Sequence, residues 1–154
     1  GAPFQYSTAY HAYLRAALAK LGPADERKRQ IELAKRGLAA ALRHVADSSE
    51  LPHISHLNAE TGACGRLNHR DFFWPPILKT YRLLKDLGEP GMEKVAEKIT
   101  SVDPDDSFHV RAPGNWAMVW LNGEWIRIRE GLGGMARDAF EREIAVFFER
   151  NLSV

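Results

Sequence analysis

The side chains best suited to chemistry lie together in the stretch RLNHRDFFW, residues 66–74. Asn68, His69 and Arg70 place an amide, an imidazole and a guanidinium side by side, directly before three aromatic residues and the pair Pro75-Pro76. Such groups can grip a carboxylate or a sugar, because all three offer hydrogen bonds and the guanidinium binds carboxylates through two parallel N–H groups. We therefore take these three as candidate site residues. The structural alternative is that they cap turns and pair with nearby surface acids.

Four potential zinc ligands lie in the same part of the chain, at the spacing H-x2-H-x7-C-x4-H. They are His53, His56, Cys64 and His69. A zinc ion would order a long loop, but this spacing matches no common zinc finger and includes no pair of cysteines. We therefore assign no metal and expect no cofactor, and keep structural zinc as an alternative. Cys64 is the sole cysteine, which excludes an intrachain disulfide.

Two amphipathic helices precede the polar stretch. The first is predicted to end at Gly22-Pro23, and its apolar stripe is Tyr10, Tyr13, Leu14, Ala17, Leu18 and Leu21. The second is expected to have Asp25 and Glu26 in its first turn, where carboxylates complement the positive end of the helix dipole. Its apolar stripe is Ile31, Ala34, Leu38, Leu42 and Val45. Its other face is basic, and we interpret that face as a solvated surface: Arg27, Lys28, Arg29, Lys35, Arg36 and Arg43.

A polar region without regular periodicity, residues 47–71, separates the second helix from the third. Its Pro, Gly, His and Asn content predicts a long loop, and loops of this length in a compact domain commonly carry function. The third helix is predicted to begin at Pro75 or Pro76, because proline is tolerated in the first turn, and to end at Gly88. A shorter helix is expected over residues 91–100.

The segment 116–129 matches two kinds of structure. Asn122-Gly123 is a strong hairpin signal, and the residues after it partly alternate between apolar and polar. A second set of positions falls instead at helical spacing: Trp116, Val119, Trp120, Gly123, Ile126 or Arg127, and Glu130. A lone hairpin also buries little surface. We therefore predict a helix here, and a last helix after Gly133-Gly134.

These elements predict an all-α fold, in which helical hairpins are joined by one long polar loop. A chain of 154 residues can bury a core of its own, so residues 1–154 form either a single helical domain or a fragment of a larger one. The chain has 21 Lys and Arg against 20 Asp and Glu, a net charge of +1 that does not indicate a nucleic-acid partner. No apolar run reaches the roughly 18 residues of a membrane span, so no membrane partner is expected.

The segment GNWAMVWLNGEWIRIREG resembles the Asn-Trp-x-x-Val segment that opens a helix in α/α-toroid polysaccharide lyases, the group that includes heparinase II/III-like and alginate lyase-like enzymes. The resemblance implies that the helical hairpins are the N-terminal part of an incomplete α/α toroid. It also implies cleavage of a uronic-acid-containing polysaccharide by β-elimination, with Asn115 neutralising the uronate carboxylate.

The start Gly1-Ala2-Pro3-Phe4 fits a mature end or a tag remnant, so we expect a periplasmic or secreted protein, with a cytoplasmic location as the alternative.

The chemistry of β-elimination gives His69 and Arg70 roles beside Asn115. Removal of a proton next to an ionised carboxylate builds further negative charge on that group, and amide and guanidinium donors stabilise it. A general base must titrate near neutral pH, and an imidazole with a pKa of about 6.5 does so. We therefore assign Asn115, His69 and Arg70 as catalytic candidates. Substrate-binding candidates are Asn68, Trp74, Trp116 and Trp120, since indole rings stack on sugars.

Two other functional classes stay open. One is a carbohydrate-binding or glycoside-hydrolysing helical domain, in which tryptophans stack on sugars and Asp71, Glu124 or Glu130 act as acids, although no carboxylate pair is singled out by its spacing. The other is a non-catalytic helical interaction module, whose tryptophans belong to the core.

Two spatial expectations follow from the pattern. Residues 66–74 and 113–120 are both polar-to-aromatic transitions before helices, so we expect them to line one cleft. The last helix carries an apolar face with few residues after it: Phe140, Ile144, Phe147 and Phe148. We expect a second chain, or a missing C-terminal part, to cover that face.

Overall fold

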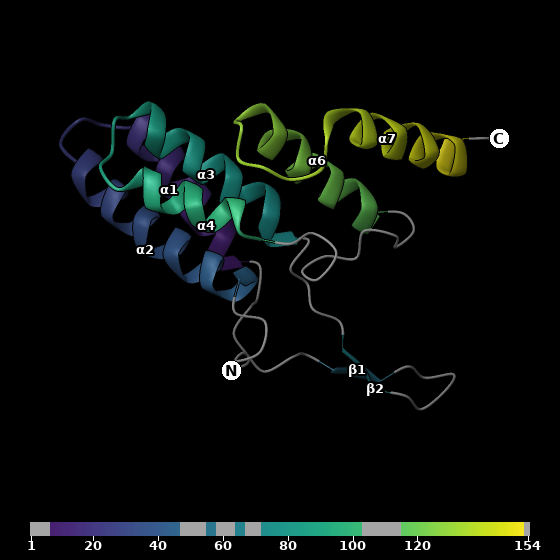
Figure 1. The fold of residues 1–154 in the computed structure, drawn as a ribbon. Helices are drawn as coiled ribbons and strands as arrows, with labels where there is room; N and C mark the ends of the chain where they lie inside the picture. The colour runs from purple at the N-terminus through teal and green to yellow at the C-terminus, as the bar shows by residue number, and fades with distance from the viewer. Residues whose placement is uncertain (1–6, 47–54, 58–63, 67–71, 103–114, 153–154) are drawn as a thin grey trace.

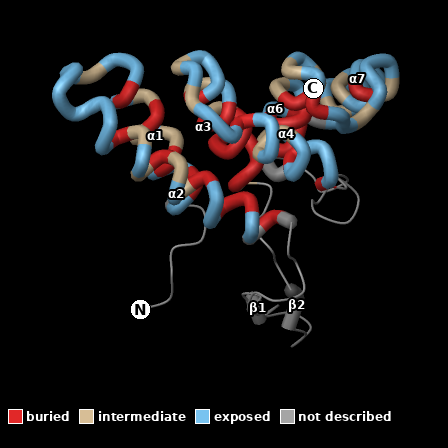
Figure 2. Tube along the Cα trace, turned by 60° about the vertical axis from the view of Figure 1, so that its left-hand side comes forward, coloured by how far each residue is buried: buried red, intermediate tan, exposed pale blue. Residues whose placement is uncertain are grey.

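The fold is all-α, as the sequence predicts, and the helices pack as three neighbouring pairs (Figures 1 and 2). A computed structural model describes residues 7–46, 55–57, 64–66, 72–102 and 115–152. The elements in chain order are α1 (Ser7–Leu21), α2 (Arg27–Ala46), β1 (Ser55–Leu57), β2 (Cys64–Arg66), α3 (Trp74–Asp86), α4 (Met92–Thr100), α6 (Asn115–Arg129) and α7 (Arg137–Leu152). No helix in the described part of the chain is long and apolar enough to cross a membrane.

The first helical pair, α1 and α2, is joined at Gly22-Pro23, as expected, but α1 buries a different face from the predicted one. Its buried residues are Ala9, Ala12, Ala16 and Ala19. Of the six residues in the predicted stripe, Tyr13 and Ala17 are half-buried. The other four, Tyr10, Leu14, Leu18 and Leu21, are between 38% and 84% exposed. Close packing against α2 explains this, because a Cβ at Gly37 would lie 2.8 Å from the Cβ of Ala12. Only small side chains fit between the two helices.

The turn before α2 also corrects a prediction. α2 begins at Arg27, so Asp25 and Glu26 precede the helix and its first turn contains no acidic residue. The Glu26 carboxylate accepts a hydrogen bond from the Gln30 side-chain amide at 2.9 Å. On the inner face of α2, Ala34, Leu38, Leu42 and Val45 are buried as predicted, and Ile31 is half-buried.

Residues 47–71 are not wholly irregular, because strands β1 and β2 form a short antiparallel hairpin within them. Ser55 pairs with Arg66, His56 with Gly65 and Leu57 with Cys64. The expected featureless loop is therefore wrong at these positions. Of the potential zinc ligands, His56 lies on β1 and Cys64 on β2, whereas His53 and His69 lie outside the described residues.

Helix α3 lies at the centre of the molecule, between α1 and α6 (Figure 2). It begins at Trp74, one residue before Pro75 and two before Pro76, the two predicted starts, and both prolines lie in its first turn. Eight of its 13 residues are buried: Trp74, Pro75, Pro76, Ile77, Leu78, Thr80, Tyr81 and Leu84. Tyr81 is only 4% exposed, so it is a core residue.

The segment 116–129 is helical, as predicted, and Asn122-Gly123 lies within α6 rather than in a turn. A side chain at Gly123 would overlap the indole ring of Trp74, so glycine is required here for close packing of α3 on α6. After α6 the chain turns at Gly131, where φ is +69°, a conformation that glycine adopts without steric cost. α7 follows, and among its described side chains Phe140 is buried.

Candidate functional site at the junction of α3 and α6

The predicted site residues divide into three groups by what the structure describes. Asn68, His69 and Arg70 lie outside the described residues. Asn115 and Trp116 are the first two residues of α6. Trp74 and Trp120 lie where α3 packs against α6. Since part of each stretch is outside the described ranges, a shared cleft between residues 66–74 and 113–120 stays a prediction.

Trp74 and Trp120 are core residues, with exposures of 0% and 1%. Neither ring offers a face on which a sugar could stack in this structure. The indole N–H of Trp74 donates a hydrogen bond to Glu124 Oε1 at 2.7 Å. Trp74 therefore links the start of α3 to the middle of α6.

A buried ion pair between Glu124 and Arg127 forms the centre of this junction. Their side chains are 0% and 1% exposed, and Arg127 Nη1 lies 3.4 Å from Glu124 Oε1. The Arg127 guanidinium carbon lies 5.4 Å from the centroid of the Trp74 ring. Burial of the two charges is tolerated because each has the other as its partner, and Glu124 Oε1 also accepts the hydrogen bond from Trp74.

Arg127 also binds three backbone carbonyl groups. Its Nε donates to Leu132 O at 3.1 Å, and its Nη2 donates to Thr100 O at 3.0 Å and Val102 O at 2.9 Å. Thr100 is the last residue of α4, where carbonyl groups lack helical partners and the helix dipole favours a positive charge. One side chain thus joins α4, α6 and the turn after α6.

Two buried polar atoms at the junction have no hydrogen-bond partner among the described residues: Trp120 Nε1 and Glu124 Oε2. The two residues are four apart on α6, so their side chains leave the same face of the helix. Glu124 Oε2 lies close to Gly134, because a Cβ added at Gly134 would be 2.6 Å from this oxygen. Chemically, one atom donates a hydrogen bond and the other accepts, a set that water or a hydroxyl group can satisfy.

From the sequence, Glu124 is a candidate only as an acid for hydrolysis, and Arg127 is not singled out. The sequence does contain a sign of this buried ion pair. Positions 120, 124 and 127 lie on one helical face and carry tryptophan, glutamate and arginine. Charged residues on a face that begins with tryptophan indicate either a site or a buried ion pair.

A second carboxylate connects the far ends of α3 and α6. Glu130, directly after α6, lies 3.3 Å from Lys85 Nζ and 3.5 Å from Arg82 Nε. The hydrogen bond from Lys85 to Glu130 raises the pKa of the Lys85 ammonium group. Glu130 therefore serves as an interhelical ion-pair partner in this structure.

Comparisons with protein-family models, characterised proteins and solved structures give no significant match to this chain. The likeness to toroid lyases therefore rests on the residues quoted for it.

Proposed function

We propose that the chain is the helical N-terminal part of a polysaccharide lyase that cleaves uronic-acid-containing polysaccharide by β-elimination. The proposal is supported by the neighbouring positions of α3 and α6. α3 begins at Trp74, four residues after Arg70, and α6 begins at Asn115. Both helices begin on the side of the molecule where β1 and β2 lie (Figure 1).

In the proposed reaction, each of three side chains has a separate role. Asn115 and Arg70 stabilise the negative charge that develops on the uronate carboxylate. His69 removes the proton beside that carboxylate, and the electron pair of the C–H bond forms a carbon–carbon double bond. The bond to the glycosidic oxygen on the adjacent carbon breaks, and its electron pair goes to that oxygen. The oxygen then takes a proton from water or from the protonated imidazole of His69, which completes the leaving group.

The buried network at the α3–α6 junction has a positioning role in this proposal. Trp74, Glu124 and Arg127 fix the axis of α6 relative to α3 and α4. In this proposal, a fixed helix axis is what allows a donor at the first residue of α6, Asn115, to be preorganised for a developing charge. Trp74 and Trp120 then support the site from the core, instead of contacting the sugar.

A second candidate function, a non-catalytic interaction module, is favoured by an apolar groove of about 370 Å³. It lies between α6 and α7 and is lined by Met118, Leu121, Asn122, Trp125, Phe140, Ile144, Phe147 and Phe148. Met118 is 55% exposed, Trp125 41% and Phe148 51%. In this proposal a second chain, or a further part of the protein, covers the groove.

The test of lyase function is an absorbance assay of the longest available form of the protein with a panel of uronic-acid polymers, since the proposal makes this chain one part of the enzyme. Elimination creates an unsaturated uronyl product that absorbs in the ultraviolet, whereas hydrolysis creates reducing ends without that absorbance. Asn115→Ala should lower kcat by about 10² to 10³, the typical loss for one preorganised donor to a developing oxyanion. The matched control is Asn122→Ala, an exposed asparagine on the same helix, which should keep full activity. No absorbance change with any polymer, together with no thermal shift, would exclude the lyase proposal.

A further inference from the structure

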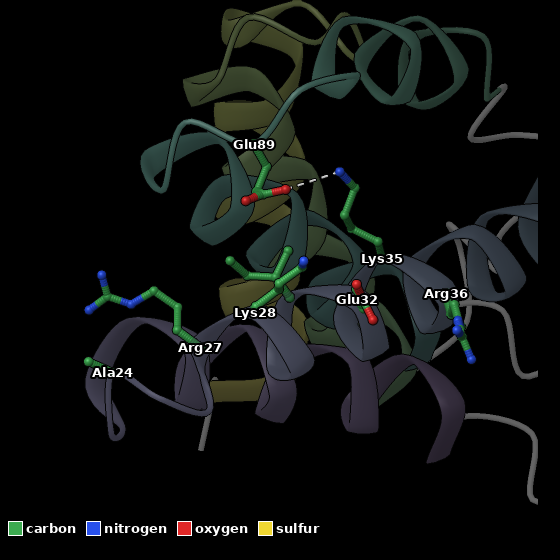
Figure 3. A pocket seen from close by; sticks show the side chains of 8 residues that line it. Ala24, Arg27, Lys28, Glu32, Lys35, Arg36 and Glu89 are labelled. Atoms are coloured by element: carbon green, nitrogen blue, oxygen red, sulfur yellow. Dashed lines mark hydrogen bonds and ion pairs between the residues drawn. The ribbon is translucent and has the colours of Figure 1, made fainter.

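A basic groove lies on α2, outside the α3–α6 junction. Its volume is about 700 Å³, and it is bounded by α2 on one side and by Glu89, in the turn between α3 and α4, on the other (Figure 3). The lining residues are Ala24, Arg27, Lys28, Ile31, Glu32, Lys35, Arg36 and Glu89. Four of these carry a positive charge and two a negative charge, so the groove has a net positive charge at neutral pH.

One ion pair fixes the width of the groove. Lys35 Nζ lies 3.1 Å from Glu89 Oε2, and it also donates a hydrogen bond to Pro90 O at 3.2 Å. These contacts hold α2 to the α3–α4 turn across the groove. Figure 3 shows the ion pair between Lys35 and Glu89. The groove is therefore formed before any ligand binds, which lowers the entropic cost of binding.

Other cations of the groove remain available to a ligand. Lys28 and Arg36 form no ion pair with any described residue. Arg27 uses Nε to donate to Ala19 O at 3.1 Å, which leaves its two terminal nitrogens unused among described contacts. Lys28, Glu32 and Arg36 follow one another at four-residue spacing, about 6 Å per step along the helix. They form a row of alternating charge, positive, negative, positive.

We infer that this groove binds an acidic saccharide chain, through its carboxylate or sulfate groups and its hydroxyl groups together. The lysine and arginine side chains bind the anionic groups. Glu32 and Glu89 are acceptors for sugar hydroxyl groups, which a ligand with only anionic groups could not use. The site is separate from the α3–α6 junction, so binding here does not depend on cleavage.

The same lining disfavours a nucleic acid. Duplex DNA carries one phosphate charge per about 1.7 Å, so phosphates would face the two carboxylates of the groove as well as its cations. Aromatic side chains, on which the bases of single strands stack, are absent from the eight residues that line the groove.

The experiment measures fluorescence anisotropy of labelled oligosaccharides in the presence of the complete chain. The probes are an alginate oligosaccharide, with carboxylates only, a heparin oligosaccharide, with sulfates as well, and single-stranded DNA of equal charge. The groove variant is Lys28→Gln with Arg36→Gln. The matched control is Arg29→Gln with Arg43→Gln, which removes the same charge from exposed positions of α2 outside the groove.

The groove variant should bind at least one of the two oligosaccharides about tenfold more weakly, since two charge contacts are lost, and the control should differ less than twofold from the parent chain. The relative affinities of the two oligosaccharides distinguish recognition of carboxylates from recognition of sulfates. Equal weakening in both variants, no saccharide binding by the parent chain, or tighter binding of DNA would each overturn the inference. Equal melting temperatures of the variants show that the fold is intact, and because binding is measured without turnover, an inactive lyase would not affect the result.

Discussion

At the scale of single residues, the structure depends on two charged side chains in its core. Glu124 and Arg127 are fully buried, and each is compatible with burial because the other is present. The spacing of positions 120, 124 and 127 showed that they share a helical face, but not that α4 would end beside them. Thr100 O, which Arg127 binds, is 27 residues away in the sequence. Contacts between such distant residues depend on tertiary packing, which local periodicity does not report.

Replacement of Arg127 by methionine tests this dependence. Arg127→Met leaves the Glu124 carboxylate buried without its cation and removes the donors to three carbonyl groups. We expect the free energy of unfolding to fall by about 3–5 kcal/mol. Urea denaturation measures the change. The double variant Glu124→Gln, Arg127→Met should recover part of the lost free energy of unfolding, because no buried charge remains. If Arg127→Met alone lowers the free energy of unfolding by less than about 1 kcal/mol, the ion pair is dispensable.

At the scale of elements, the positions of the helices could be predicted from the sequence, but the face that a helix buries could not always be predicted. The periodicity and the terminators located α1, α3, α4 and α7, and helical spacing was the correct choice over the hairpin signal in α6. In α1 two stripes have helical period, one of large apolar residues and one of alanines. Hydrophobicity alone favours the large residues, but close approach of Gly37 to Ala12 selects the alanines. Gly123 has the same kind of role against Trp74.

Substituting one residue from each stripe of α1 tests which stripe is buried. Ala16 is 0% exposed and Leu14 is 53% exposed. Ala16→Leu should overpack the core beneath α1 and lower the free energy of unfolding by about 1–3 kcal/mol. Leu14→Ala should change it by no more than about 0.5 kcal/mol, because the side chain is mostly in water. Thermal and urea denaturation at low protein concentration give both values, and the reverse order of costs would mean that the large residues are the buried ones.

At the scale of the whole molecule, three helical pairs lie in a row, with α1 and α2 at one end and α6 and α7 at the other (Figure 2). Apolar side chains are exposed at both ends. On α1 they are Tyr10, Leu14, Leu18 and Leu21. At the other end they are Met118, Trp125, Val146 and Phe148. Two different apolar surfaces at opposite ends suit head-to-tail contacts, in which each surface meets a different one.

The exposed apolar ends predict association that depends on concentration. Burial of these side chains stabilises a contact by roughly 25 cal/mol per Å² of apolar surface, which favours association of the chain with itself or with a further helical partner. Sedimentation velocity should show species larger than a monomer as the protein concentration rises. Leu18→Glu with Phe148→Glu places a charge at each end, and should shift the distribution toward monomer. The control, Arg29→Glu with Arg43→Glu, adds two glutamates and changes charge at exposed, non-apolar positions of α2, and should leave association in place. A parent chain that stays monomeric over the whole concentration range would show that neither end associates with a second copy, and the remaining proposal would be a different partner at the α6–α7 groove.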